Sequence, residues 1–197
     1  RYIPEKGVLD LEKAFTEIQN EFPNEWKLNC IGLGPLSEKM CNHPKINHIG
    51  FVQPIDLRKY TSKGGVFILP SHFEPWGLVV HEFSMAGFPL IVSDAVGSAD
   101  QFVLNGKNGY IFQSKSVDAL KDSMLKIIHS SNEKLFDMSK NSIQICAFCN
   151  KQKSEVNILI SVLRWCVNPE NVKEFFPSAE DPGDLFGGIL SHTSLKP

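Results

Sequence analysis

Two glutamates, Glu74 and Glu82, lie eight positions apart on either side of a Pro-Trp-Gly sequence. The apolar run at 65–69 has the length of a strand, and residues 77–86 carry apolar side chains at helical spacing. Glu82 would lie roughly 7.5 Å along that helix at ~1.5 Å per residue, whereas Glu74 would stay on the loop. The spacing therefore predicts one carboxylate on each side of a helix N-terminus.

The helix N-terminus is the second part of this candidate site. Its backbone N–H groups, which lack partners within the helix, favour an anion there. They belong to Gly77, Leu78 and Val79. A phosphate bound to them would have a carboxylate on each side, and each carboxylate can accept hydrogen bonds from sugar hydroxyls. We interpret the segment as a binding site for a nucleotide-sugar. The alternative is that both glutamates are ordinary surface charges.

The composition limits the classes of protein to consider. The 197 residues suffice for one sizeable domain, alone or with an appendage, and 42% hydrophobic residues with a net charge of -2 fit a soluble globular protein. The basic residues are dispersed, so no nucleic-acid surface is expected. No apolar run approaches the ~20 residues of a membrane helix, and no signal peptide is found. We expect a cytoplasmic protein, cut from a longer one because it opens on Arg1.

The cysteines are predicted to be reduced thiols, because their number is odd and Cys30 lies in an apolar run that should be a buried strand. The Cys-Ala-Phe-Cys sequence at 146–149 has redox or zinc spacing, but it has no second pair and falls in a predicted helix. Cys41, His43 and His48 flank a Pro-containing turn without a convincing fourth ligand. The sequence therefore predicts no metal site.

Strands and helices are predicted to alternate along the chain. Strands are expected at 26–31, 46–52, 66–69, 90–92 and 110–112. Helices are expected at 6–22, 36–42, 55–60, 77–86, 116–129 and 132–146, with a further short helix ending near 103. Ser116 is the predicted N-cap of its helix. This alternation predicts an α/β fold, an open parallel sheet with helices on both faces.

The composition changes after residue 166. A further helix is expected over 154–165, and the Pro- and Gly-rich stretch 167–197 is expected to be an irregular tail. We therefore predict a domain at 1–166 and a C-terminal tail at 167–197.

Four segments in this order resemble the C-terminal, donor-binding domain of family 4 glycosyltransferases. They are Arg1–Gly7, Gly32–Gly34, Glu74–Glu82 and Asn108–Gly109. The resemblance covers roughly residues 1–165. Members of this family are retaining enzymes of the GT-B architecture, in which the active site lies between two Rossmann-like domains. The resemblance implies that this chain is one such Rossmann-like domain, and that it binds a nucleotide diphosphate sugar.

The resemblance also implies roles for single residues. Arg1 and Lys6 would neutralise the donor pyrophosphate, on which negative charge develops as the leaving group departs. Glu74 would orient the donor sugar near its reacting carbon, and Glu82 would bind the ribose hydroxyls. Further donor contacts, mostly from the backbone, are expected from Gly77, Leu78, Val79, Gly34 and Val52.

Two neighbouring side chains are expected to stay outside the chemistry. Trp76 is expected to pack under the turn, and His81 is expected on the helix surface rather than as a catalytic base.

The chain departs from the family in what it lacks. The N-terminal domain that binds the acceptor is absent, and so is the first strand expected just before Arg1. The chain alone is therefore not expected to transfer sugar. The parent protein would use a glycan or another hydroxyl compound as acceptor, with peripheral membrane association and a role in polysaccharide biosynthesis. The Asp-x-Asp metal signature is missing, so neither a metal ion nor a cofactor beyond the donor is expected.

Three other functions are alternatives to this one. A non-catalytic module would recognise nucleotide-sugars or a partner protein without chemistry. An epimerase would need further acid–base residues around the sugar, and none stands out near Glu74. A phosphorylase of the cofactor-dependent type would carry a lysine for pyridoxal phosphate in another motif, which is not found.

Overall fold

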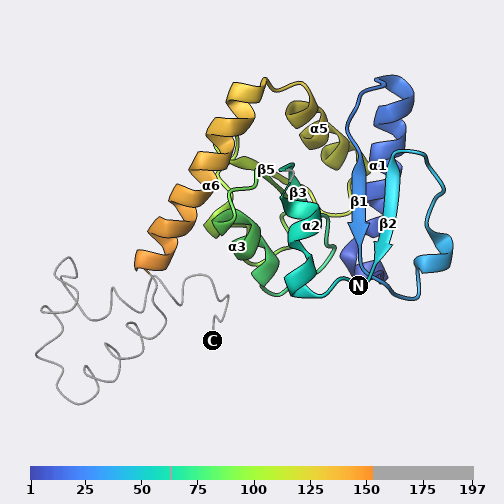
Figure 1. The fold of residues 1–197 in the computed structure, drawn as a ribbon, viewed down its shortest axis with the longest axis horizontal. Helices are drawn as coiled ribbons and strands as arrows, with labels where there is room; N and C mark the ends of the chain where they lie inside the picture. Colours follow the sequence, from blue (N-terminus) through green and yellow to red (C-terminus); the bar gives the residue numbers. More distant parts are fainter. Residues whose placement is uncertain (63, 153–197) are drawn as a thin grey trace, which may run out of the picture. The chain divides into compact units, whose positions relative to one another are not determined.

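Parallel strands and helices alternate along the residues that the computed structural model describes, 1–62 and 64–152 (Figure 1). The strands are β1 (Leu28–Ile31), β2 (Ile46–Gly50), β3 (Phe67–Leu69), β4 (Leu90–Ser93) and β5 (Gly109–Phe112). The α-helices are α1 (Val8–Glu21), α2 (Arg58–Thr61), α3 (Leu78–Met85), α4 (Ala99–Phe102), α5 (Val117–Ile128) and α6 (Asn132–Gln152). Short 3-10 helices are η1 (Pro4–Lys6), η2 (Ser37–Lys39) and η3 (Pro54–Asp56). The predicted order of elements is confirmed within these residues.

The strands form two parallel sheets in the described part of the chain. One contains β1 and β2, and the other contains β3, β4 and β5 in that order. The sequence analysis expected one open parallel sheet, whereas the structure has two that the N-terminal segment connects. The backbone of residues 1–7 is hydrogen-bonded to both sheets: the Tyr2 N–H donates to the Leu33 carbonyl just beyond β1, and the His72 N–H, just beyond β3, donates to the Glu5 carbonyl. The N-terminal segment therefore links the carboxyl ends of β1 and β3.

Helices cover both faces of the second sheet, as predicted. All four residues of β4 are buried, and its side chains alternate between two apolar clusters. Ile91 packs with side chains of α1 and α5, such as Phe15 and Leu120. On the other face, Leu90 and Val92 pack with side chains of α3 and α4. A strand that is apolar on both sides is typical of a parallel sheet between two helical layers. This arrangement is the Rossmann-like fold class that the sequence predicted.

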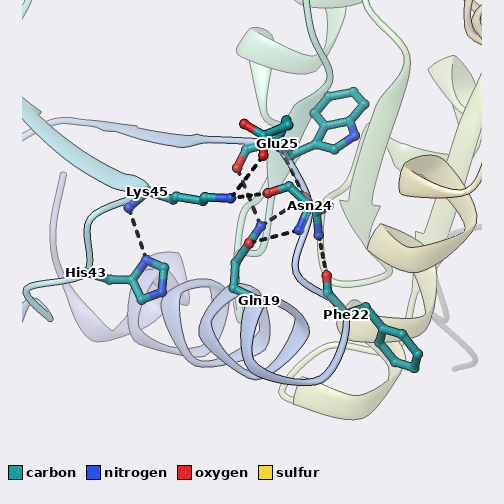
Figure 2. A network of polar contacts seen from close by, with 7 residues as sticks. Gln19, Phe22, Asn24, Glu25, His43 and Lys45 are labelled. Atoms are coloured by element: carbon teal, nitrogen blue, oxygen red, sulfur yellow. Dashed lines mark hydrogen bonds and ion pairs between the residues drawn. The ribbon is translucent and has the colours of Figure 1, made fainter.

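A polar network joins the end of α1 to the start of the first sheet, and Figure 2 shows it from close by. The Gln19 side chain donates to Asn24 Oδ1 at 2.9 Å, and the Trp26 N–H donates to the same oxygen at 3.1 Å. From the β2 side, the Lys45 ammonium donates to the Asn24 carbonyl and lies 3.8 Å from a Glu25 carboxylate oxygen. These bonds fix the turn that returns the chain from α1 to β1.

Replacing Ser116 by alanine is expected to lower the free energy of unfolding by about 1 kcal/mol. The structure confirms this residue as the N-cap of α5, because its Oγ accepts a hydrogen bond from the Ala119 N–H at 3.1 Å. Urea unfolding measures the change. Ser116→Asp keeps a capping acceptor and should stay within about 0.5 kcal/mol of the wild type. An equal loss in both variants would show that the cap contributes nothing.

Several sequence predictions lie outside the described residues. They are the helix at 154–165, the domain boundary at 166 and the irregular tail at 167–197. Among the helices that the structure does describe, none combines the length and the apolar character needed to cross a bilayer.

Candidate active site

Two loops at the carboxyl ends of β3 and β4 are hydrogen-bonded to each other and hold the turn that contains Glu74. The Glu74 N–H donates to the Ala95 carbonyl at 3.1 Å, and the Gly97 N–H donates to the Glu74 carbonyl at 3.0 Å. The Ser98 N–H donates to the Trp76 carbonyl at 2.9 Å. The carboxyl ends of parallel strands are where open α/β sheets bind their ligands. The Glu74 backbone is therefore fixed at the expected edge of the sheet.

The Glu74 carboxylate accepts a hydrogen bond from the Lys6 ammonium, and the two side chains form an ion pair. Their exposed fractions are 17% for Glu74 and 26% for Lys6, so the pair is shielded but reachable from solvent. Residues 6 and 74 are far apart in sequence, and the fold brings them together. A cation and a carboxylate side by side can bind a phosphate and a sugar hydroxyl at adjacent points.

Lys6 is held in this position by the turn between η1 and α1. The Glu5 carbonyl accepts the N–H groups of His72 and Phe73 at 2.8 and 3.3 Å. Gly7 follows with a positive φ of 62°, and a Cβ there would lie 2.0 Å from the Pro70 carbonyl oxygen. Only glycine allows the chain to pass so close to the loop after β3. Lys6 is therefore positioned by backbone contacts on either side of it.

The N-terminus of α3 begins directly after Gly77, which has φ 85° and ψ 60° and acts as the N-cap without a side-chain bond. The N–H groups of Leu78 and Val79 have no carbonyl one turn before them, as at every helix start. A Cβ on Gly77 would lie 2.8 Å from Val96 Cγ1 and 3.2 Å from the Glu74 side chain. The helix N-terminus is thus packed directly against the Glu74 side chain, and an anion bound there would lie close to the Lys6–Glu74 pair.

Glu82 lies one turn further along α3 and is exposed. Leu78, which precedes it by four residues, is 66% exposed. Residues four apart share one face of a helix, so the start of α3 and the Glu82 carboxylate face solvent on one side. A ligand that lies along this face could contact both.

The structure connects three of the predicted site residues less directly to the Lys6–Glu74 pair. They are Arg1, Gly34 and Val52. Gly34 lies against the N-terminal segment, where a Cβ would be 2.4 Å from the Tyr2 carbonyl oxygen, so close packing explains this glycine. The backbone nitrogen of Arg1 lies beside Gly32, while its side chain is exposed and makes no ion pair within the described residues. Val52 follows β2 in a loop and is not joined to the Lys6–Glu74 pair by a hydrogen bond within the described residues.

The prediction for Trp76 was wrong, because its side chain is 43% exposed instead of packed under the turn. The loop after β4 packs tightly against this turn, because a Cβ on Gly97 would lie 2.1 Å from the Pro75 carbonyl oxygen. His81 was expected on the helix surface, and it is partly buried there, because its ring stacks on the buried Phe102 with ring centroids 4.9 Å apart.

The sequence analysis missed a second polar pair next to the first. His72 Nε2 lies 2.7 Å from an Asp10 carboxylate oxygen, and both side chains are partly buried. His72 stands two residues before Glu74, and Asp10 lies in the first turn of α1. The pair ties α1 to the loop after β3, and the Lys6–Glu74 pair ties η1 to the same loop. A contact between residues so distant in sequence leaves no local pattern that could have predicted it.

Comparison with known proteins gives a consistent result. Residues 1–145 match the family model described as glycosyl transferases group 1. The chain is 35% identical over 150 residues to the alpha-monoglucosyldiacylglycerol synthase of Acholeplasma laidlawii, covering 72% of this chain and 36% of that protein. It is 28% identical over 171 residues to the poly(glycerol-phosphate) alpha-glucosyltransferase of Bacillus subtilis strain 168, covering 78% of this chain and 25% of that one.

Solved structures agree with the fold. The pneumococcal O-GlcNAc transferase GtfA, crystallised in complex with UDP and GlcNAc, superposes with a TM-score of 0.64 at 26% identity. That match covers 81% of this chain and 34% of GtfA. The chain spans between a quarter and about a third of the length of the relatives named here.

Proposed function

The chain belongs to the group 1 family of glycosyl transferases, and we propose that it is the donor-binding half of a retaining family 4 hexosyltransferase. It would bind a nucleotide diphosphate sugar. With an acceptor-binding domain in the full-length protein, it would pass the sugar to a hydroxyl acceptor with retention of configuration. The observation that carries this proposal is the Lys6–Glu74 ion pair packed against the N-terminus of α3.

In the proposed complex the diphosphate lies at the N-terminus of α3. The bond between the sugar carbon and the leaving phosphate oxygen breaks, and the electron pair stays on that oxygen. The Lys6 ammonium and the first N–H groups of α3 stabilise this charge, and Arg1 adds to it. The acceptor hydroxyl attacks the same face of the sugar carbon and passes its proton to the departing phosphate oxygen. Glu74 orients the sugar hydroxyls and Glu82 accepts hydrogen bonds from the ribose.

This arrangement needs no metal ion for the transfer step. The positive charge that a divalent cation would provide at a diphosphate comes from Lys6, Arg1 and the helix N-terminus. We therefore propose that the donor is the only small molecule the reaction requires besides the acceptor, and that added magnesium or manganese leaves the rate of transfer unchanged.

The acceptor would be a glycan or another hydroxyl compound. The names of the relatives indicate that one of them makes a glycolipid, a monoglucosyldiacylglycerol, and that the other transfers glucose to a polymer, poly(glycerol-phosphate). A related role here would place the full-length protein in cytoplasmic polysaccharide or glycolipid synthesis, with peripheral association at a membrane surface.

Calorimetric titration of the chain with UDP-, GDP-, ADP- and dTDP-sugars tests the donor proposal. One of them should bind, and Glu82→Ala should weaken its binding about 10-fold, since hydrogen bonds to a charged acceptor contribute roughly 1.5–3 kcal/mol. Glu133→Ala, which removes an exposed carboxylate of α6, is the matched control and should bind normally. Binding of none of the four donors contradicts the proposal. Binding without transfer by the full-length protein would indicate a non-catalytic module instead.

A further inference from the structure

Three unlike polar side chains converge at the side of the β1–β2 sheet, where two of them are buried and the third, His48, is 31% exposed. Glu12 comes from α1, Cys30 from β1 and His48 from β2. One potential metal-ligand atom from each, a carboxylate oxygen, a thiol sulfur and an imidazole nitrogen, lies within 4.8 Å of the other two. Among the described residues this is the one such group of histidine, cysteine and acidic side chains.

The backbone fixes two members of the group on one face. Cys30 and His48 are register partners on the parallel strands β1 and β2, so their side chains point to the same side of this sheet. α1 packs against that side, as Figure 1 shows, and Glu12 faces inward from it. Three rigid elements therefore present the three side chains, which is the arrangement that precise ligand geometry requires.

The Glu12 carboxylate is 3% exposed, and its bonding within the protein is incomplete. One oxygen accepts a hydrogen bond from the Cys41 N–H at 3.0 Å. The other oxygen is buried and has no hydrogen-bond partner. His48 Nε2 is 3.2 Å from that second oxygen and 3.0 Å from the Cys41 carbonyl oxygen, so a single N–H on Nε2 could not serve both acceptors fully. A buried carboxylate oxygen without a donor is unfavourable unless a cation neutralises it.

The ligand types and their spacing suit one particular ion. Zinc binds cysteine sulfur at about 2.3 Å and histidine nitrogen or carboxylate oxygen at about 2.0–2.2 Å, with tetrahedral geometry. Two such nitrogen and oxygen ligands are then about 3.3 Å apart. The 3.2 Å between His48 Nε2 and Glu12 Oε1 has this length. A mixed set of thiolate, imidazole and carboxylate favours zinc over magnesium or calcium, which prefer oxygen alone.

We propose that Glu12, Cys30 and His48 bind a zinc ion, and that this ion fastens α1 to β1 and β2. His48 would coordinate through Nε2 in its neutral form, with the proton on Nδ1. The Cys30 proton would be released to solvent as the thiolate binds the ion. His48 and Cys41 also line a surface depression of about 380 Å³, so solvent water would be available as a fourth ligand.

Zinc binding must overcome the environment of the Cys30 thiol, which disfavours the thiolate. Burial, together with the nearby Glu12 carboxylate and Cys41, raises the pKa of Cys30 to about 12. The thiol is then neutral at pH 7 and inert, and a bound cation reverses this, because a coordinating thiol loses its proton. The site was not found from the sequence, which considered Cys41, His43 and His48. Only His48 of that trio belongs to the group, and the His43 ring packs edge-on against Phe15.

Substitution with cobalt(II) tests the site through its spectrum, independently of sugar transfer. The chain, freed of metal by chelation, should take up one equivalent of cobalt and show a thiolate-to-cobalt charge-transfer band. Cys30→Ser should abolish that band and weaken zinc binding at least about 100-fold, more than the 10–100-fold typical of residues that only orient a ligand. Glu12→Gln and His48→Gln should keep the band but bind zinc more weakly. Zinc should raise the Tm of the wild type and not that of Cys30→Ser.

Two matched variants test whether other histidine or cysteine side chains bind the metal. His43→Gln removes a histidine of the same loop, and Cys149→Ser removes one thiol of the 146–149 pair in α6. Both should bind cobalt as the wild type does. Far-UV circular dichroism in chelator shows whether each variant is folded. The proposal is overturned if the folded wild type binds no cobalt, if Cys30→Ser keeps the charge-transfer band, or if Cys149→Ser loses it. The first two results would leave Glu12 and His48 as a buried ion pair.

Discussion

Replacing Lys6 by alanine is expected to lower the rate of sugar transfer about 10²- to 10³-fold in a protein that also carries the acceptor-binding domain. Lys6 is the positive side chain that the structure places beside Glu74, next to the N-terminus of α3. Negative charge grows on the diphosphate as the sugar leaves, and a fixed ammonium stabilises that charge more in the transition state than in the bound donor. Initial rates with saturating acceptor measure the effect on kcat and KM.

The control for this variant is Lys13→Ala, which removes an exposed lysine from the same helix region without touching the loop after β3. Its rate should match the wild type. If Lys6→Ala transfers sugar at the wild-type rate, the proposed role in charge stabilisation is wrong.

A second variant separates the two members of the pair. Glu74→Gln removes the negative charge beside Lys6, so the ammonium is free to interact with phosphate alone. Binding of the nucleoside diphosphate of whichever donor binds should then tighten, while the added affinity that the donor sugar provides should fall. A variant that weakens binding of this nucleoside diphosphate and of the donor equally would indicate that Glu74 acts only by positioning Lys6.

The sequence could predict the site because most of it lies in one contiguous segment. Glu74, Gly77 and Glu82 come within nine residues, and the strand before them and the helix after them follow from apolar periodicity. The local rules of strand, turn and helix are enough to place a helix N-terminus beside a carboxylate. The order of strands and helices was predictable for the same reason, since each element carries its own pattern.

Contacts between distant segments could not be predicted in this way. The N-terminal segment lies between the two sheets because Tyr2 and Glu5 find partners beyond β1 and β3. The proposed zinc ligands Glu12, Cys30 and His48 come from α1, β1 and β2, and the local sequence around each shows nothing unusual. Glu12 in particular falls on the buried face of an amphipathic helix, where sequence alone reads it as a break in the apolar pattern.

The exposure of Trp76 shows another limit of the sequence analysis. An aromatic side chain in a turn was assigned to the core because large apolar residues are usually buried. The structure fills that space with backbone, and the indole lies partly in solvent beside the candidate site. Burial of a side chain in a loop depends on how close the neighbouring loop comes, and this distance is set by residues 95–98, some twenty positions later.

Replacing Gly7 by alanine is expected to lower the free energy of unfolding by about 3 kcal/mol or more. Two costs act together at this position. The backbone has φ 62°, which L-residues adopt only at a cost, and the new Cβ would lie 2.0 Å from the Pro70 carbonyl oxygen. The oxygen belongs to a backbone held between β3 and α3, so the clash cannot be relieved by rotating a side chain. Urea unfolding gives the free energy, and donor titration shows whether Lys6 has moved.

Gly106→Ala is the matched control, because it has the cost of a positive φ but not the cost of a clash at Cβ. Gly106 has a φ of 76°, close to that of Gly7, but no heavy atom lies within 4 Å of the place where its Cβ would be. This variant should lose only the roughly 1–2 kcal/mol of the left-handed conformation, and it should bind the donor normally. The difference between the two variants isolates the approach of the η1–α1 turn to Pro70. If the free energy of unfolding of Gly7→Ala is no lower than that of Gly106→Ala, the close contact with Pro70 costs nothing to relax. The position of Lys6 beside Glu74 must then be maintained by the Glu5 hydrogen bonds alone.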